Sequence, residues 1–321
     1  MTDRENIKHL AIIGAGTMGA GIAGECARAG YTVSLLDRDL NLAQKGLNAM
    51  HNAQQALVQA HRLTAAEAEK ASARITATDH LKTACEKADL IIEAASENLA
   101  VKQELFAQLD TLCPSHTLFT TNTSGLSITK IAQATRRPAH IAGLHFWNPP
   151  HLVPLVEVTR GEHTSEDTAQ TLLTLCRNLG KKPILVKHDI PGFVGNRLQF
   201  AVMREAMHLL NKGVATAEDI DTAMSSGPGL RYALLGPLRT ADLGGLDVFH
   251  AISQYLFAEL NADSTPSPIL EKLVSKGQFG AKTGAGFYSY SQQELQEWIN
   301  RRDRVLIGFL NVLEQEAHRH V

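Results

Sequence analysis

Short apolar runs rich in β-branched residues alternate with longer segments of helical periodicity from residue 8 to about residue 188. This alternation is typical of a parallel sheet with helices on both of its faces. Residues 40–79, rich in Ala, Gln, Glu and Lys, predict a helical excursion that is too long for a simple crossover. The strands are predicted at residues 8–13, 32–37, 89–93, 117–121, 140–144 and 183–187.

The pattern changes after residues 188–192, because strand signals disappear and apolar residues recur at helical spacing. A domain boundary is predicted there, with an α/β domain over residues 1–188 and an all-helical domain over residues 189–321. An apolar stripe on the first helix of the second domain fits either the core of that domain or a contact between subunits. The stripe consists of Leu198, Val202, Ala206 and Leu209.

A glycine-rich turn joins the first predicted strand to the helix that follows it. The run Ile12-Ile13-Gly14-Ala15-Gly16-Thr17-Met18-Gly19 matches the GxGxxG pattern, and Asp37 ends the second predicted strand. Gly14 allows the tight turn, Gly16 lets the backbone approach a pyrophosphate, and Gly19 lets the helix pack on its strand. The Asp37 carboxylate can bind an adenosine ribose but repels a 2′-phosphate. The sequence therefore predicts a Rossmann-type doubly wound sheet that binds NAD, with Thr17 and Met18 beside the cofactor.

Composition narrows the classes of partner. The chain has 321 residues, of which 44% are hydrophobic and 20% charged, with a net charge of −2. These values predict an ordinary soluble protein that binds neither nucleic acid nor a membrane. The polar segment 1–6 predicts no signal peptide, so the cytoplasm is the expected location. The four cysteines form no CxxC pair, which indicates buried reduced thiols and no metal site.

Two polar segments follow predicted strands at the edge where open α/β sheets bind ligands. They are Thr121-Asn122-Thr123-Ser124 and His145-Phe146-Trp147-Asn148-Pro149. Oxidation of an alcohol by NAD needs a base for the hydroxyl proton, and histidine suits this role near neutral pH. Glu157 is the lone acid of the extended apolar run 152–158 and needs a partner. We therefore predict that Glu157 orients His145 as the base, and that Ser124 hydrogen-bonds the reacting oxygen.

Further motifs are spread over nearly the whole chain. They are GAGTMGAGIA at 14–23, NTS at 122–124, GLHF at 143–146, NP at 148–149, LVE at 155–157, PGF at 191–193, NR at 196–197 and KTGAGFY at 282–288. With these motifs the chain resembles the 3-hydroxyacyl-CoA dehydrogenase family. The resemblance implies NAD-dependent oxidation of the 3-hydroxyl of an L-3-hydroxyacyl-CoA, a reaction of fatty acid metabolism.

The resemblance also implies roles for individual residues. His145 is expected to be the general base, Glu157 its orienting partner, and Ser124 and Asn196 polar contacts to the substrate. A simpler alternative role for Asn196 is the N-terminal cap of its helix. The family further implies a homodimer formed through the helical domain. Contacts to the nicotinamide side of NAD are expected near Glu93, Glu97, Lys102 and Asn122.

Three departures from the family pattern concern the substrate. Gly125 stands where acyl-CoA enzymes of the family usually have a second serine, and residues 150–154 and 226–237 differ in character from theirs. The chain looks more like the branch of lambda-crystallin/L-gulonate, L-carnitine and pyridine-carboxylate dehydrogenases. The alternative substrate is therefore a CoA-free β-hydroxy acid, whose carboxylate Arg231 could hold in a bidentate pair. In the helical excursion, Arg62 and Lys70 could instead meet CoA phosphates, although any solvated helix carries such charges.

A second alternative is a non-catalytic, crystallin-like protein that retains the NAD site. The four candidate catalytic residues argue against it, because they are all intact. They are Ser124, His145, Glu157 and Asn196.

Overall fold

The computed structural model describes residues 7–319. Contacts divide the chain into a first unit, which runs to Asn196 and resumes at Asp303, and a second unit, residues 197–302. The sequence pattern placed the boundary at residue 188 and assigned everything after it to the helical domain. The contacts instead return the end of the last helix to the first unit.

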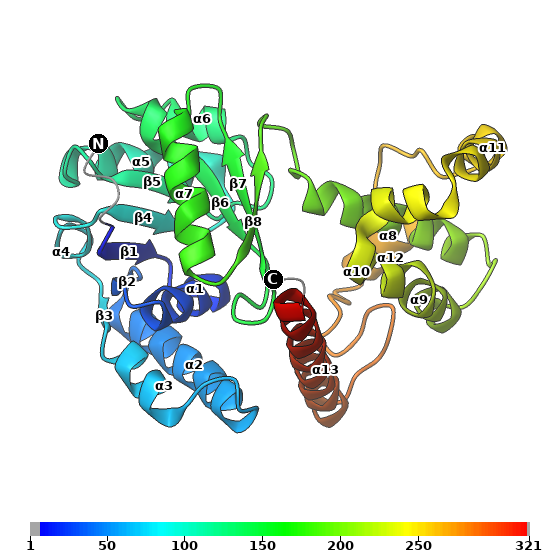
Figure 1. Ribbon diagram of the computed structural model, residues 1–321, viewed down its shortest axis with the longest axis horizontal. Coiled ribbons are helices and arrows are strands. Elements are labelled where there is room, and N and C mark those ends of the chain that lie inside the picture. The colour runs from blue at the N-terminus through cyan, green and yellow to red at the C-terminus, as the bar shows by residue number, and fades with distance from the viewer. Residues whose placement is uncertain (1–6, 320–321) are drawn as a thin grey trace. The chain divides into compact units, whose positions relative to one another are not determined.

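The first unit is built on one sheet of eight strands in the order β3-β2-β1-β4-β5-β6-β7-β8 (Figure 1). Every neighbouring pair is parallel except β6 and β7, which are antiparallel. The strands are β1 (His9–Ile13), β2 (Thr32–Leu36), β3 (Ile75–Thr78), β4 (Leu90–Glu93), β5 (Leu118–Thr121), β6 (Ile141–Phe146), β7 (Leu155–Arg160) and β8 (Lys182–Val186). The Rossmann-type doubly wound fold is confirmed.

Helices cover both faces of the sheet, because alternate residues of the central strands are apolar on each face (Figure 1). Leu10 and Ile12 pack in the core beneath α1, α2 and α7, whereas Ala11 and Ile13 pack in the core beneath α5 and α6. The helices are α1 (Thr17–Arg28), α2 (Leu40–Gln59), α3 (Ala65–Ser72), α4 (Leu81–Cys85), α5 (Leu99–Leu112), α6 (Ile128–Ala132) and α7 (Glu166–Asn178), with a 3-10 turn at Pro138–His140.

The structure corrects three details of the predicted sheet. The excursion 40–79 is not helical throughout, because it ends in the edge strand β3. The β-branched residues Ile75 and Thr76 favour a strand, but the Ala-rich and Glu-rich residues before them favour a helix and dominated the prediction. The extended run around Glu157 forms β7, an eighth strand. Only residues 147–154 separate β6 from β7, too few for a crossover, so the two strands pair antiparallel.

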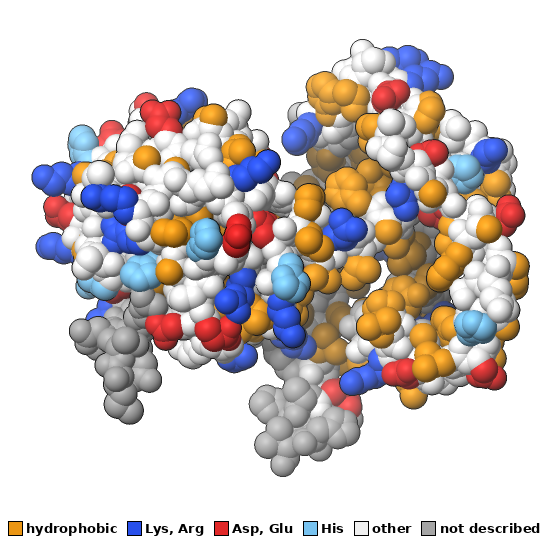
Figure 2. Space-filling model, turned by 90° about the horizontal axis from the view of Figure 1, so that it is seen from above, with side chains coloured by type: hydrophobic (Ala, Val, Ile, Leu, Met, Phe, Trp, Pro, Cys, Tyr) orange, Lys and Arg blue, Asp and Glu red, His pale blue; other side chains and the backbone are white. Residues whose placement is uncertain are grey.

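The second unit is helical and almost lacks a buried core of its own. Of residues 197–302, all of which the structure describes, only Met207 is buried. Figure 2 shows many hydrophobic side chains at the surface of this unit. Its helices are α8 (Gly195–Asn211), α9 (Ala217–Ser226), α10 (Pro228–Gly244), α11 (Leu246–Leu256), α12 (Pro268–Ser275) and the first part of α13 (Gln292–Arg319).

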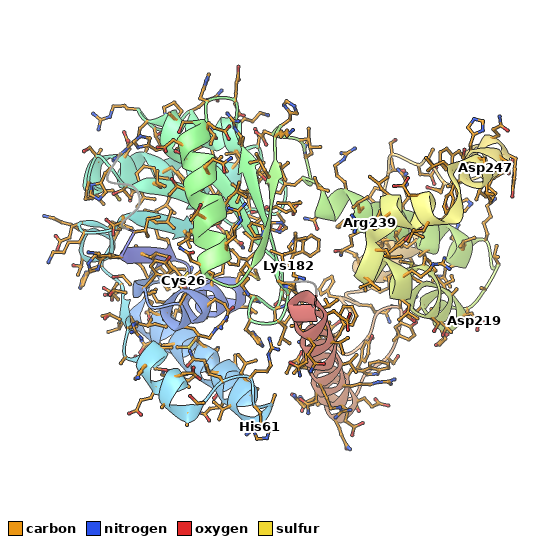
Figure 3. The ribbon with its side chains drawn as sticks, viewed as in Figure 1. Cys26, His61, Lys182, Asp219, Arg239 and Asp247 are labelled. Atoms are coloured by element: carbon orange, nitrogen blue, oxygen red, sulfur yellow. The ribbon has the colours of Figure 1, made fainter. Side chains whose placement is uncertain are left out.

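The cysteines are all buried free thiols in the first unit, as predicted. Cys26 on α1 is labelled in Figure 3, and burial raises its pKa, so it is an inert core residue. Within residues 7–319, no helix combines the length and the apolar character that crossing a membrane requires.

Candidate active site

The glycine-rich turn between β1 and α1 has the geometry that a bound pyrophosphate requires. Gly14 has a φ of 101°, and a Cβ there would lie 2.6 Å from the Ala94 carbonyl oxygen. A Cβ at Gly19 would lie 1.8 Å from the Gly14 carbonyl oxygen, so α1 packs directly on the turn. A Cβ at Gly16 would meet no described atom within 4 Å. The space at Gly16 is therefore open to a ligand.

The N-terminus of α1 supplies the donors for such a ligand. Its N-cap is Gly16, which has no side chain to satisfy the amides of the first turn. These amides and the positive end of the helix suit a phosphate. The chain therefore fits the diphosphate of NAD at this turn.

Asp37 is fixed beside the same turn. Its Oδ2 accepts a hydrogen bond from the Ala15 amide, and its Oδ1 accepts one from the Arg38 amide, each at 2.8 Å. Asp37, Gly16 and Thr17 line a cleft of about 410 Å³. Met18 packs against the core instead of lining this cleft. The cleft is also lined by Ala15, Ala20, Gly21, Leu42, Lys45, Gly46, Ala49, Met50, Ala53, Pro149, Pro150 and His151.

A buried ion pair lies at the end of β4. Glu93 and Lys102 are 0% and 1% exposed, and the lysine Nζ lies 2.6 Å from Oε1 and 2.8 Å from Oε2 of the glutamate. The Thr121 hydroxyl donates to Oε2 and the Ala95 amide donates to Oε1. Lys102 was predicted to contact the cofactor, and the structure places its ammonium group in this network beneath the strand ends.

Glu97 links this network to the segment that carries Ser124. Its Oε2 lies 3.6 Å from Lys102 Nζ, and its Oε1 accepts hydrogen bonds from the Thr123 hydroxyl at 2.6 Å and the Ser124 amide at 2.9 Å. Asn122, in the same segment, accepts a hydrogen bond from the Phe146 amide at 2.8 Å. The ends of β4, β5 and β6 are thus joined by polar side chains.

The predicted catalytic pair forms in the structure. His145 and Glu157 are directly opposite each other in the β6–β7 register, and His145 Nδ1 lies 2.8 Å from Glu157 Oε2. β6 continues through Phe146, so His145 lies within a strand and not after it. Because Nδ1 faces the carboxylate, Nε2 is the ring nitrogen left to accept a substrate proton.

Four donors converge on the Glu157 carboxylate, which is fully buried. Besides His145, the amides of Val194 and Gly195 donate to Oε1 at 3.0 and 2.9 Å, and the Trp147 indole donates to Oε2 at 3.3 Å. Burial by itself would raise the pKa of Glu157, but hydrogen bonds from His145 and the two amides, together with the charge of His145, lower it. Glu157 is therefore held as a carboxylate.

Trp147 is a site residue that sequence reasoning missed. Its ring centroid lies 5.4 Å from that of His145. The ring centroid of Phe193 lies 5.8 Å from that of the same imidazole, in an edge-to-face arrangement. A Cβ at Gly195 would lie 2.3 Å from the Trp147 ring, so glycine is required where the indole packs. The sequence shows a tryptophan close to His145 and a glycine at 195, but only the folded structure shows that these two residues are in contact.

Ser124 and Asn196 also meet. The Asn196 side-chain amide donates to the Ser124 carbonyl oxygen at 2.9 Å, and Asn196 lies in the first unit at the start of α8. Ser124 is exposed, so its hydroxyl is accessible to a ligand. Arg231 lies on α10 of the second unit, where its side chain is exposed.

Family models match both parts of the chain. Residues 9–190 match the 3-hydroxyacyl-CoA dehydrogenase, NAD binding domain, and residues 192–290 match the 3-hydroxyacyl-CoA dehydrogenase, C-terminal domain. The chain belongs to the 3-hydroxyacyl-CoA dehydrogenase family. The predicted family, the cofactor NAD and the class of NAD-dependent oxidoreductase are thereby confirmed.

One similar protein is named for a pyridine carboxylate. The 5-formyl-3-hydroxy-2-methylpyridine 4-carboxylate 5-dehydrogenase of Mesorhizobium japonicum is 36% identical over 309 residues, 96% of this chain and 99% of the relative. A crystal structure bearing that enzyme's name matches with a TM-score of 0.90, 34% identity and the same two coverages.

Other relatives are named for CoA substrates. The probable 3-hydroxybutyryl-CoA dehydrogenase of Bacillus subtilis is 40% identical over 288 residues, 89% of this chain and 99% of the relative. The crystal structure of (S)-3-hydroxybutyryl-CoA dehydrogenase PaaH1 from Ralstonia eutropha matches with a TM-score of 0.75 and 37% identity, covering 89% of this chain and 100% of the other.

Proposed function

We propose that this protein uses NAD to oxidise the 3-hydroxyl group of an L-3-hydroxyacyl-CoA to the 3-oxo group. The observation that carries the proposal is the buried His145–Glu157 pair, 2.8 Å apart, at the strand ends of a family NAD-binding domain. NAD, when bound, accepts the hydride from the carbinol carbon. His145 Nε2 takes the hydroxyl proton as the carbon–hydrogen bond breaks.

The other site residues support this proton transfer. Glu157 holds His145 through Nδ1 and stabilises the imidazolium that forms, because a fixed negative charge lies beside the new positive one. Ser124 hydrogen-bonds the reacting oxygen, and Asn196, bonded to the Ser124 carbonyl, is a second polar contact. These roles also argue against the non-catalytic alternative, since a binding protein has no need of a buried acid–base pair.

The cofactor contacts are proposed at two places. Gly14, Gly16 and Gly19 shape the pyrophosphate turn, with Thr17 and the backbone of Met18 beside it and Asp37 on the adenosine ribose. Glu97 and Asn122 act at the nicotinamide side, and the buried Lys102 supports them through its charge, 3.6 Å from Glu97. A comparison of dissociation constants for NAD and NADP tests Asp37, and tighter binding of NADP would contradict its role.

A CoA-free β-hydroxy acid is the second candidate substrate. It is favoured by the TM-score of 0.90 with the pyridine-carboxylate dehydrogenase, against 0.75 with the 3-hydroxybutyryl-CoA dehydrogenase. In that case Arg231 would bind the substrate carboxylate. For the thioester, the reaction belongs to fatty acid metabolism.

A second copy of the chain is the proposed partner. The helical unit buries only Met207 among residues 197–302, and a unit with so little core needs another surface to cover its apolar side chains. A homodimer through this unit provides one. The four unpaired cysteines favour a reducing compartment, and we propose the cytoplasm.

The first experiment measures NADH formation with L-3-hydroxybutyryl-CoA and with a panel of CoA-free acids, for the wild type and His145→Gln. Loss of the base should lower kcat by about 10²- to 10⁴-fold on whichever substrate is turned over. Turnover of the thioester supports the main proposal, and activity on free acids alone supports the second candidate. Unchanged turnover by His145→Gln would overturn the mechanism.

A further inference from the structure

The cleft beside Asp37 has two walls that come from different parts of the chain. One wall is α2, which contributes Lys45, Gly46, Met50 and their neighbours, and the other is the loop Pro149–His151 between β6 and β7. Neither wall belongs to the sheet. The width of the cleft therefore depends on what holds the helix and the loop in place.

Both walls are attached firmly at the end near the pyrophosphate turn. A Cβ at Gly46 would lie 2.3 Å from the Ala15 carbonyl oxygen, so α2 is in direct contact with the turn. On the loop, the Pro150 carbonyl accepts a hydrogen bond from Lys181, which also pairs with the buried Glu25 at 2.7 Å. These contacts fix one end of each wall.

A third segment, distant in the sequence, joins the walls at their other ends. Leu57, three turns beyond Gly46 on α2, and Leu152, next to His151, belong to one buried apolar cluster. Leu306 and Ile307 of α13 pack against this cluster. The helix α13, which begins in the second unit, therefore packs against a cluster to which both walls contribute a residue.

A polar contact reinforces the same junction. Arg62 lies in the turn between α2 and α3, next to His61, which is labelled in Figure 3. Its guanidinium donates to Asn311 Oδ1 at 2.5 Å. Arg62 was considered a candidate for CoA phosphates, and the structure uses it to hold the C-terminal helix.

We infer that residues 303–319 of α13 form a cofactor-positioning clamp, which holds α2 and the loop 149–152 at the separation that NAD binding needs. The inference rests on NAD occupying this cleft. A cleft already held in its binding conformation avoids the ordering cost that a loose one would pay. The clamp lies beyond residues 192–290, which match the C-terminal family domain.

The test uses the full-length chain and measures NAD binding by calorimetry without substrate. In the double variant Leu306→Ala with Ile307→Ala, the cleft should have the width that NAD binding needs in only a fraction of the molecules. If that fraction is about one tenth, the dissociation constant for NAD rises about 10-fold. The value of kcat at saturating NAD should stay within about twofold of the wild type, because the clamp does not touch the His145–Glu157 pair.

The matched control is Val305→Ala with Val312→Ala on the same helix, since both valines are exposed. This control should bind NAD as the wild type does. Arg62→Met gives an independent variant if the double alanine variant fails to fold, and it should also weaken NAD binding. A folded clamp variant with the wild-type dissociation constant for NAD would overturn the inference.

The outcomes separate the clamp from the proposed function. Weakened NAD binding in the clamp variants, without turnover of any hydroxy substrate by the wild type, would sustain the clamp and refute the catalytic proposal. Normal turnover by the wild type, with unaltered NAD binding in the clamp variants, would support the catalytic proposal and refute the clamp.

Discussion

The two units of this protein differ most in what their side chains bury. The first unit places two apolar cores on opposite faces of its sheet, and even its ionic groups at Glu93 and Lys102 are buried in a complete network. The second unit, residues 197–302, buries only Met207 and leaves large apolar side chains such as Leu234 and Leu238 exposed. The first unit therefore holds its polar side chains in a close-packed frame, whereas the second leaves large apolar side chains uncovered.

The largest expected effect tests the buried network of the first unit. Lys102→Met leaves Glu93 buried without its cation, which should lower the free energy of unfolding by about 3–5 kcal/mol. Lys82→Met, at an exposed lysine on α4, is the control and should change it by less than about 0.5 kcal/mol. Urea denaturation measures both. If the two variants proved equally stable, the ion pair would not support this region.

The next effect tests whether the second unit is covered by another copy of the chain. Leu238 on α10 is 83% exposed, and Leu238→Lys should weaken dimerisation by about 2–4 kcal/mol if it lies at the centre of an interface. Light scattering over a dilution series gives the dimer dissociation constant. Val101→Lys, on α5 of the first unit, is the control. A wild-type constant for Leu238→Lys would remove this part of α10 from the interface.

Acid should affect the first unit more than the second. Hydrogen bonds outweigh the effect of burial at Glu157 and at Asp89, so the pKa of each carboxyl group lies below its ordinary value, 4.5 for Glu and 3.8 for Asp. The stability that these groups contribute is present above about pH 4.5 and is lost as pH falls through their folded pKa values. Amide hydrogen exchange at pH 5 and pH 3 should show protection falling first in β6 and β7. Earlier loss in α9–α11 would contradict this order.

The smallest effect sharpens the description of the dyad. Trp147→Phe keeps the ring beside His145 but removes the indole donor to Glu157 Oε2. A carboxylate with one donor fewer stabilises the imidazolium more, so the acid limb of kcat/KM should move to higher pH by a few tenths of a unit. Trp298→Phe, in the second unit, is the control. An unmoved limb would make Trp147 a packing residue only.

Much of the site was predictable because its signals are local. The turn Gly14–Gly19 and the acid Asp37 are needed at fixed spacing, since a pyrophosphate and a ribose have fixed dimensions. His145 and Glu157 could be paired because a lone acid in an apolar strand requires a partner. Trp147 and Gly195 could not be paired in advance, because their contact depends on how the segment 191–195 folds back onto β7.

The sequence by itself determined the Rossmann-type fold, the glycine-rich turn beside Asp37 and the contact of His145 with Glu157, because alternating hydrophobicity and short motifs specify them locally. The tertiary structure decided what depends on distant segments. It made 155–160 an antiparallel strand that sets Glu157 opposite His145, and it placed Lys102 beneath the strand ends. It also returned residues 303–319 to the first unit. Such contacts between remote segments follow from packing and charge pairing in three dimensions, which no local pattern specifies.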